Sequence, residues 1–470
     1  MNEKKMQGIN PYLPSWEYIP DGEPYVFNDR VYIYGSHDIF DGHVFCLGDY
    51  VCWSAPVDDL GNWTYEGVIY GKTDDPLNKD GRMCLYAPDV VQGPDGRYYI
   101  YYVYDKVSVV SVAVCDTPAG KYEFLGYVHY KDGTKLGDRE GDEPQFDPGV
   151  IREGDKTYLY TGFCPRGDKS RSGSFCFVLG PDMLTIEEDG VLVAPGIMNP
   201  DHGSFEGHEF FEASSIRKRG NTYYFIYSSI WMHELCYATS DSPQGPFTYK
   251  GVIVSNCDHG IGTYKDAEFP TMYGANNHGS IVEIAGEWYI FYHRHTNGNW
   301  YSRQGCAEII HFTEDGEIPQ VEITSQGLNA APLIGKGEHM AYTACNLFTE
   351  GEPHMYVGDP GEPMIKQRLD EGMDKPEPFI SGIKDKTFIG FKYYDCKGIT
   401  KVSIKVRGYG DGVFEVRTGI DSPVLAEMKV ENTNIWTEYS SDIELADGTY
   451  AIYISYKGSG SLQMLSFSLD

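Results

Sequence analysis

The segment FFEASSIRKRGNTYYF, residues 210–225, contains the repeat that decides the fold. An acidic residue precedes a short apolar run, and a turn separates that run from a Tyr-rich apolar run. The same order recurs in DGEPYVFNDRVYIY from Asp21, DVVQGPDGRYYIYY from Asp89, DPGVIREGDKTYLY from Asp147 and HGSIVEIAGEWYIF from His278. Five copies of one supersecondary unit predict a fold made of stacked repeats.

The residues that open the five copies share one position in the repeat. Eleven residues separate the opener from a Tyr of the second run in four copies, which pair Asp21 with Tyr32, Asp147 with Tyr158, Glu212 with Tyr223 and His278 with Tyr289. In the copy that Asp89 opens, the separation to Tyr99 is ten residues. Four acids and one histidine are therefore structurally equivalent.

The local pattern of each copy is typical of β-strands. Tyr, Phe, Val and Ile alternate with polar residues in short runs that Gly, Asp, Asn and Pro bound. A second element recurs in WSAPVDDLGNWTYEGVIY from Trp53, CDTPAGKYEFLGYV from Cys115 and SDSPQGPFTYKGVI from Ser240. Each copy thus has an inner and an outer hairpin, which predicts an all-β, five-bladed β-propeller with four strands per blade at about residues 10–325.

In a propeller, the first strand of every blade lies nearest the central channel, so the openers are expected to face one axial site. A single Asp beside Gly or Pro is explained by turn capping. Capping does not explain Glu212 inside FFEAS or the acidic character of the set. Because clustered carboxylates repel one another and shift their pKa values apart, the cluster indicates a functional site.

Paired carboxylates are what glycoside hydrolysis requires, since one protonates the leaving oxygen and the other activates water or attacks the sugar. A metal site is the alternative, because Asp, Glu and His are all ligands. The openers lie some 60 residues apart without a compact ligand motif, which favours hydrolysis.

Seven segments, taken in order, carry a resemblance to a known family: NPYLPSWEYIPDGEPYVF, YAPDV, FDPGVI, FFEASSIRK, NNHGS with YHRH, RQGCAEI and ITSQG. Over about residues 10–328 the chain resembles glycoside hydrolase family 43, whose five-bladed propellers include β-xylosidases, α-L-arabinofuranosidases and endo-arabinanases. The resemblance implies an inverting exo-glycosidase that releases arabinose or xylose from plant-derived oligosaccharides, with no cofactor required for the chemistry.

The resemblance also implies roles for three acids. Asp21 corresponds to the general base that activates water, and Glu212 corresponds to the general acid. Asp147 corresponds to the acid that raises the pKa of its partner and orients it. Inversion implies carboxyl groups about 6.5–9.5 Å apart. The base motif here is PDGEP instead of a simple Asp-Pro, which makes Glu23 a rival for Asp21, although the eleven-residue register favours Asp21.

Other candidate site residues come from the same resemblance and from the chemistry of sugars. His278 either fills the channel or holds an axial ion or water, and any calcium there is expected to be structural. Arg303 resembles the arginine that reaches substrate hydroxyls, with a surface salt bridge as its alternative; Arg294 is a weaker candidate. Trp supplies flat apolar platforms for sugar faces, and Trp16, Trp231 and Trp300 lie near the acid-bearing segments.

The length of 470 residues allows two domains. We expect a catalytic propeller at residues 1–330, a connecting segment rich in Gly, Pro and charge at 331–378, and a β-sandwich at 379–470. The closing Gly-Ser turn before LQMLSFSL resembles a carbohydrate-binding module of family 6. The sequence leaves open whether this domain binds sugar or packs against the propeller.

Composition limits the compartment and the partners. Eleven cysteines without a CxxC pair indicate free thiols in a reducing compartment, and no apolar targeting run is visible at the start of the sequence, so a cytoplasmic location is expected. A net charge of −31 argues against nucleic acid as a partner, and no run reaches transmembrane length. The expected partner is an oligosaccharide substrate, and oligomeric state is not predicted.

Two other functional classes remain open at this point. A glycoside phosphorylase would use phosphate in place of water, and it would need Arg, Lys or His side chains to hold that anion. A non-catalytic sugar-binding propeller would use the same pocket without turnover. The acidic openers favour hydrolysis over the phosphorylase, and the sugar-binding propeller stays open as a third alternative.

Overall fold

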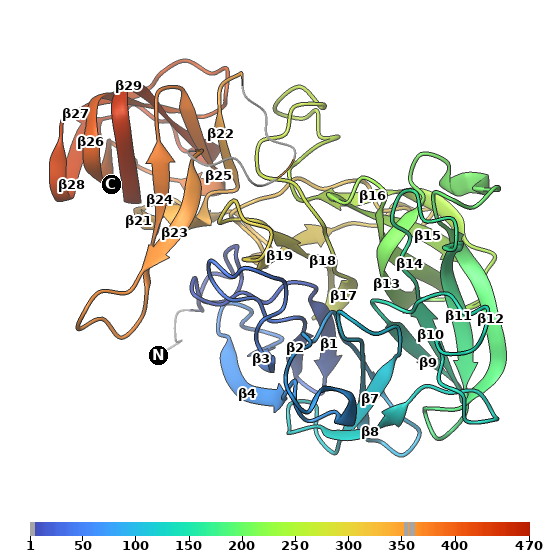
Figure 1. Cartoon of the computed structure of the whole chain (residues 1–470). Coiled ribbons are helices and arrows are strands. Elements are labelled where there is room, and N and C mark those ends of the chain that lie inside the picture. The colour runs from blue at the N-terminus through green and yellow to red at the C-terminus, as the bar shows by residue number, and fades with distance from the viewer. Residues whose placement is uncertain (1–4, 352–355, 357–361) are drawn as a thin grey trace.

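The computed structural model describes residues 5–351, 356 and 362–470. The chain is nearly all β-structure and forms a five-bladed propeller beside a curled C-terminal sheet (Figure 1). The predicted all-β fold class and the five-bladed propeller are therefore confirmed.

Four blades are antiparallel sheets of four strands in chain order. The first holds β1 (Glu23–Phe27), β2 (Arg30–Tyr34), β3 (Tyr50–Pro56) and β4 (Thr64–Tyr70). The second holds β5 (Asp89–Gln92), β6 (Tyr98–Tyr102), β7 (Ser111–Cys115) and β8 (Glu123–Tyr127). The third holds β9 (Gly149–Glu153), β10 (Lys156–Thr161), β11 (Gly173–Leu179) and β12 (Ile186–Pro195). The fourth holds β13 (Phe210–Arg219), β14 (Thr222–Ser229), β15 (Glu234–Ser240) and β16 (Thr248–Ser255).

The fifth blade differs from the expected four strands. Its sheet has three, β17 (Ile281–Ile284), β18 (Glu287–Arg294) and β19 (Gln304–Ile310). The N-terminal segment lies beside β19, because the Tyr12 N–H donates to the Gly305 carbonyl (3.2 Å) and the Ala307 N–H donates to Asn10 Oδ1 (2.9 Å). An isolated parallel bridge pairs Gly22 with Gly279. The start of the first blade thus closes the ring against the last.

Buried side chains pack between neighbouring blades. One cluster joins the second and third blades through residues such as Tyr101, Val112 and Leu159, and another joins the third and fourth through residues such as Tyr160 and Phe225. The strands are crowded near the axis: a Cβ added at Gly279 would lie 1.8 Å from the Phe291 carbonyl oxygen. Only glycine fits at that position without a backbone shift.

The C-terminal strands form one hydrogen-bonded, ten-stranded sheet. Its strands are β20 (Leu333–Ile334), β21 (Gly337–Met340), β22 (Asn346–Thr349), β23 (Met364–Arg368), β24 (Glu377–Ile383), β25 (Thr387–Cys396), β26 (Lys401–Arg417), β27 (Ala426–Val430), β28 (Thr433–Asp442) and β29 (Gly448–Leu469). The long β29 pairs with β26 on one side and with β25, β24 and β21 in succession on the other, so the sheet curls. Four of these strands come from the segment 331–378, and the domain boundaries stay predictions.

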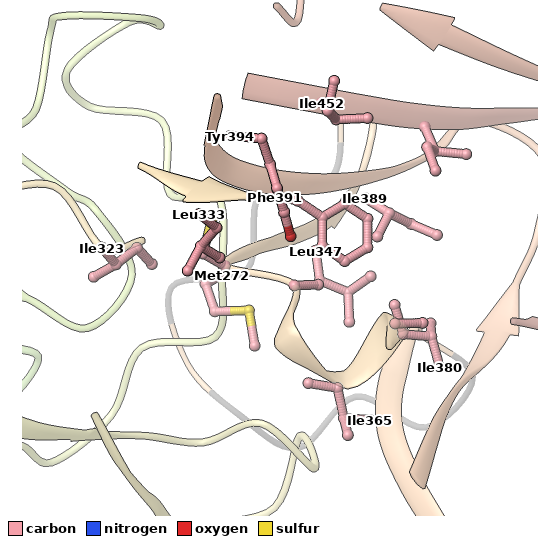
Figure 2. Close-up of a cluster of buried hydrophobic side chains, with 14 of the residues drawn as sticks. Met272, Ile323, Leu333, Leu347, Ile365, Ile380, Ile389, Phe391, Tyr394 and Ile452 are labelled. Carbon is pink, nitrogen blue, oxygen red and sulfur yellow. The ribbon is translucent and has the colours of Figure 1, made fainter. Parts of the chain in front are cut away.

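One hydrophobic core is shared by the propeller and the C-terminal sheet. Figure 2 shows Met272 and Ile323 of the propeller part beside Leu333, Leu347 and Phe391. The fully buried Lys392 also crosses this junction, with Nζ 3.2 Å from Asp258 Oδ2 and 3.0 Å from Glu322 Oε2. Removing one partner of a buried ion pair costs about 3–5 kcal/mol, so this pair ties the two parts together.

Helical structure is limited to three short 3₁₀ turns within the described residues: η1 (Pro76–Asn78), η2 (Gly203–Phe205) and η3 (Ala341–Thr343). Among those residues, none of the helices has the length and apolar character needed to span a bilayer.

Candidate functional site

Three of the predicted acids lie in one cavity of about 490 Å³. Asp21, Asp147 and Glu212 line it together with His278 and Arg303, which come from the first, third, fourth and fifth blades. Asp89, which opens the second copy of the repeat, is not among the residues that line this cavity. Asp89 is fully buried and accepts hydrogen bonds from the Tyr25 hydroxyl (2.6 Å) and the Val150 N–H (2.7 Å), so it braces neighbouring inner strands.

The backbone at the openers is strained. Asp21 has φ +58° and Asp147 has φ +44°, and Ala213, next to Glu212, has φ +68°. Residues other than glycine rarely adopt these left-handed conformations, and such strain is concentrated at functional sites. The Ala213 N–H donates to Asp147 Oδ2 (3.2 Å), and pairing of β13 with β14 shifts register around Glu212. This irregularity in the strand pairing orients the side chain of Glu212, and the Ala213 hydrogen bond links its backbone to Asp147.

Asp21 is held as a carboxylate. Its Oδ1 accepts a hydrogen bond from Arg303 Nη1 (2.9 Å) and lies 3.4 Å from His293 Nδ1. Burial favours the neutral acid, but Arg303, His293 and His278 outweigh burial and lower the pKa of Asp21 below its ordinary value. A buried carboxylate that stays ionised suits the role of a base that activates water.

Arg303 is fully engaged by two carboxylates. Besides Asp21, it donates from Nε to Asp38 Oδ2 (2.8 Å) and from Nη2 to Asp38 Oδ1 (3.1 Å). Its side chain is almost completely buried, so the alternative of a surface salt bridge is wrong. Arg294 is also buried, but it does not line the cavity and donates to Cys306 and to the Ala344 carbonyl.

Glu212 has the opposite electrostatic environment to Asp21. Burial and the nearby charges of Asp147 and Asp21 raise the pKa of Glu212 well above its ordinary value. Burial also raises the pKa of Asp147, with His278 opposing and Asp21 adding to the shift. The pKa values of Asp21 and Glu212 are thus shifted in opposite directions, which suits the roles of a base and an acid.

Glu23, the alternative to Asp21 as the base, lies outside the cavity. It is fully buried, accepts hydrogen bonds from Ser215 Oγ (3.1 Å) and Arg217 Nη2 (2.5 Å), and does not line the cavity. The geometry therefore favours Asp21 as the carboxylate that meets the substrate.

His278 lines the cavity and lies between two carboxylates. Its Nδ1 is 3.6 Å from Asp147 Oδ2, and its Nε2 is 3.6 Å from Glu23 Oε1. Burial opposes protonation, but the two carboxylates raise the pKa of His278 well above its ordinary value. At 3.6 Å, Nε2 and Glu23 Oε1 form an ion pair, and neither atom has a hydrogen-bond partner within the described residues. With its pKa raised, His278 is protonated on both ring nitrogens and itself balances the charge of the two carboxylates. The protonated ring does not fit as a direct ligand of Ca²⁺, which takes six to eight oxygen ligands.

A wall of aromatic rings surrounds the acids. Six rings touch in succession around the cavity, with centroid separations from 4.8 to 6.4 Å, in the order Tyr301, Phe45, Tyr86, Phe146, Phe163 and Phe211. Trp300 also lines the cavity, as expected for a sugar platform. The sequence analysis missed these six rings. For two of them the sequence held a signal, because Phe146 directly precedes Asp147 in FDPGVI and Phe211 directly precedes Glu212 in FFEAS.

The structure does not bring the other two tryptophans to the cavity. Trp16 is half-buried under Lys375, whose Nζ lies 4.5 Å from the ring centroid. Trp231 is 42% exposed and donates from Nε1 to the Gly207 carbonyl (2.8 Å). Its neighbour Met232 lines the cavity instead.

One other group of possible metal ligands occurs within the described residues, His208, Glu234 and Cys236. Glu234 Oε1 already accepts hydrogen bonds from His208 Nδ1 (2.6 Å), Ser229 Oγ (2.5 Å) and Cys236 Sγ (3.5 Å). This network satisfies the three side chains without an ion.

Comparisons with known proteins agree with this geometry. Residues 20–318 match the pattern of Glycosyl hydrolases family 43. The chain is 65% identical over 471 residues to a xylosidase/arabinosidase from Thermoclostridium stercorarium, and the alignment covers 99% of each protein. The GH43_1 enzyme from Xanthomonas citri, solved with xylose, aligns with a TM-score of 0.53 and 26% identity over 68% of this chain and 94% of that chain.

A solved arabinoxylan arabinofuranohydrolase from Bacillus subtilis, in complex with cellotetraose, aligns over 99% of both chains with a TM-score of 0.54. At 21% identity this similarity shows the fold alone, and it extends through the C-terminal sheet. The family match covers all three cavity acids. The chain therefore belongs to glycosyl hydrolase family 43 and is a glycoside hydrolase.

Proposed function

We propose that this enzyme is an inverting exo-glycosidase that releases arabinose or xylose from plant-derived oligosaccharides. One observation carries the proposal: Asp21 and Glu212 share a cavity, and their pKa values are shifted in opposite directions. The printed activity of the 65% identical relative, xylosidase/arabinosidase, supports the choice of sugars.

In the proposed mechanism, Asp21 takes a proton from water as the water attacks the anomeric carbon. Glu212 gives its proton to the departing glycosidic oxygen, so the rest of the oligosaccharide leaves as a neutral alcohol. Water attacks from the opposite face, so the released pentose has the inverted configuration. Asp147 keeps Glu212 protonated by its adjacent charge and is itself oriented by the Ala213 N–H. Arg303 keeps Asp21 ionised. The aromatic wall excludes water and packs against the sugar faces.

Water, and not phosphate, is the proposed acceptor. A phosphorylase needs cationic side chains free to bind the anion. At this cavity Arg303 is already bonded to Asp21 and Asp38. His278 is likewise paired, with Asp147 and Glu23. The carboxylates around the site would repel phosphate, which favours hydrolysis.

Several further features stay proposals. A structural calcium beside His278 would require a neutral imidazole and would be held mainly by water ligands, and no step of the proposed reaction depends on it. The C-terminal sheet would be a sandwich similar to a family 6 binding module. All eleven cysteines are free, which supports a reducing, cytoplasmic compartment.

The proposal is tested with 4-nitrophenyl α-L-arabinofuranoside, 4-nitrophenyl β-D-xyloside and arabinoxylan oligosaccharides, each with and without phosphate. We expect pentose release that is independent of phosphate, and we expect ¹H NMR of the first product to show the inverted anomer. A retained anomer would contradict the mechanism. No release from any of these substrates would contradict the proposed function.

A further inference from the structure

A hairpin of the C-terminal sheet reaches the propeller beside the catalytic cavity. Residues 363–376, here called the arm, comprise β23 and the turn that leads to β24, and Figure 1 shows this hairpin extending from the sheet. None of the arm residues lines the cavity. The arm nevertheless contacts the segments that carry Asp21, Arg303 and part of the aromatic wall.

The base of the arm is fixed in the shared core. Ile365 is 3% exposed and packs in the cluster of Figure 2. Its N–H donates to the Thr296 carbonyl (3.0 Å), and the Tyr273 hydroxyl donates to the Pro363 carbonyl (2.8 Å). The arm is therefore held against the loop that follows β18.

Two loops of the propeller meet at Asp41. The loop of residues 38–46 supplies Phe45 to the cavity, and the loop of residues 296–303 supplies Trp300, Tyr301 and Arg303.

Asp41 joins these loops by two hydrogen bonds. Its Oδ1 accepts from Asn297 Nδ2 (2.9 Å), and its N–H donates to Ser302 Oγ (2.9 Å). Lys366 of the arm donates from Nζ to the same Oδ1 (3.0 Å). The arm thus contributes the cation at the point where both cavity loops are tied.

The arm also contacts the segment that leads to Asp21. The Tyr18 hydroxyl donates to Gln367 Oε1 (3.4 Å), and Lys375 lies over the ring of Trp16. This explains why Trp16, which the sequence suggested as a sugar platform, lies away from the cavity. It packs under the arm instead.

We propose that the arm is a positioning element of the active site and that Lys366 acts through Asp41. The ion pair holds the loops 38–46 and 296–303 in register, which fixes the part of the aromatic wall formed by Phe45 and Tyr301 for an oligosaccharide. The C-terminal sheet therefore tunes substrate affinity without touching the sugar. This inference rests on the proposed function.

Full-length Lys366→Met tests the inference against Lys366→Arg, which keeps the charge. We expect Lys366→Met to raise KM for arabinoxylan oligosaccharides about fivefold, because a partly exposed pair couples weakly, with kcat on a small aryl glycoside within about twofold of wild type. Lys366→Arg keeps the charge, so its KM should be close to the wild-type value. The control Lys397→Met removes an exposed pair with Asp395 on the same domain and should change neither constant.

A double-mutant cycle with Asp41→Asn shows whether Lys366 acts through Asp41. We expect the double variant to be no worse than the more affected single variant, since both break one contact. Additive losses, an unchanged KM in Lys366→Met, or a loss matched by a lower Tm would overturn the inference. Failure of the proposed function would be distinguishable, because wild type would then release no pentose.

Discussion

Asp21→Asn is expected to lower kcat by about 10²–10⁴-fold on every glycoside that the enzyme cleaves. The substitution keeps the shape of the side chain but removes the charge that accepts a proton from water. Water must be activated whichever group departs. A better leaving group should therefore not restore the rate of Asp21→Asn. Initial rates on an aryl glycoside and on an oligosaccharide measure the effect.

Asp95→Asn is a suitable control, because Asp95 is an exposed carboxylate whose partner, Arg97, is also exposed. It should retain wild-type rates. Thermal unfolding of Asp21→Asn should show an intact fold, although Arg303 would keep only Asp38 as a charged partner. If folded Asp21→Asn kept activity within about fivefold of wild type, Asp21 would not be the base.

Glu212→Ala should separate substrates by leaving group. Natural oligosaccharides release an alcohol, which needs a proton, so their hydrolysis should fall by about 10²–10⁴-fold. The aryl groups of activated glycosides leave as stable phenolate anions and need no proton. The same variant should therefore cleave these substrates with a much smaller decrease in rate. The ratio of the hydrolysis rate on oligosaccharides to the rate on activated aryl glycosides should therefore fall far below the wild-type ratio.

Asp21→Ala provides the comparison for this ratio, since it should slow both classes together and leave the ratio near the wild-type value. Rates must be compared where chemistry limits turnover, which single-turnover measurements establish. Equal losses on both substrate classes in Glu212→Ala would show that Glu212 does not protonate the leaving group.

The repeat made most of the propeller predictable from the sequence. Each opener stands a fixed number of residues before a Tyr-rich strand, so the register alone placed Asp21, Asp147 and Glu212 near one axis. The same register could not show that Asp89 turns into the packing between strands, where burial and then Glu23 raise its pKa to about 7. Equivalent positions in repeats share a backbone location but not a side-chain environment.

The fifth blade could not be predicted in full, because the N-terminal segment lies beside β19 from almost 300 residues away in the chain. The aromatic wall was missed for a related reason. Phe45 and Tyr301 touch at 4.8 Å, but they come from loops of different blades without a repeated pattern. Nothing in the sequence signals that Asp38 also binds Arg303.

The contacts of the arm are likewise invisible in the sequence. Lys366 and Asp41 are separated by 325 residues, and each reads as an ordinary surface charge. Their pairing depends on how the C-terminal sheet docks on the propeller, which the shared core decides.

The central claim is that Asp21 works ionised and Glu212 works protonated, and the pH dependence of kcat/KM tests it most directly. Activity should be lost as pH falls through the lowered pKa of Asp21, and again as pH rises through the raised pKa of Glu212. On an aryl glycoside, Glu212→Ala should keep the acid limb and lose the alkaline limb. An alkaline limb that persists unchanged in Glu212→Ala would contradict the assignment of Glu212 as the acid.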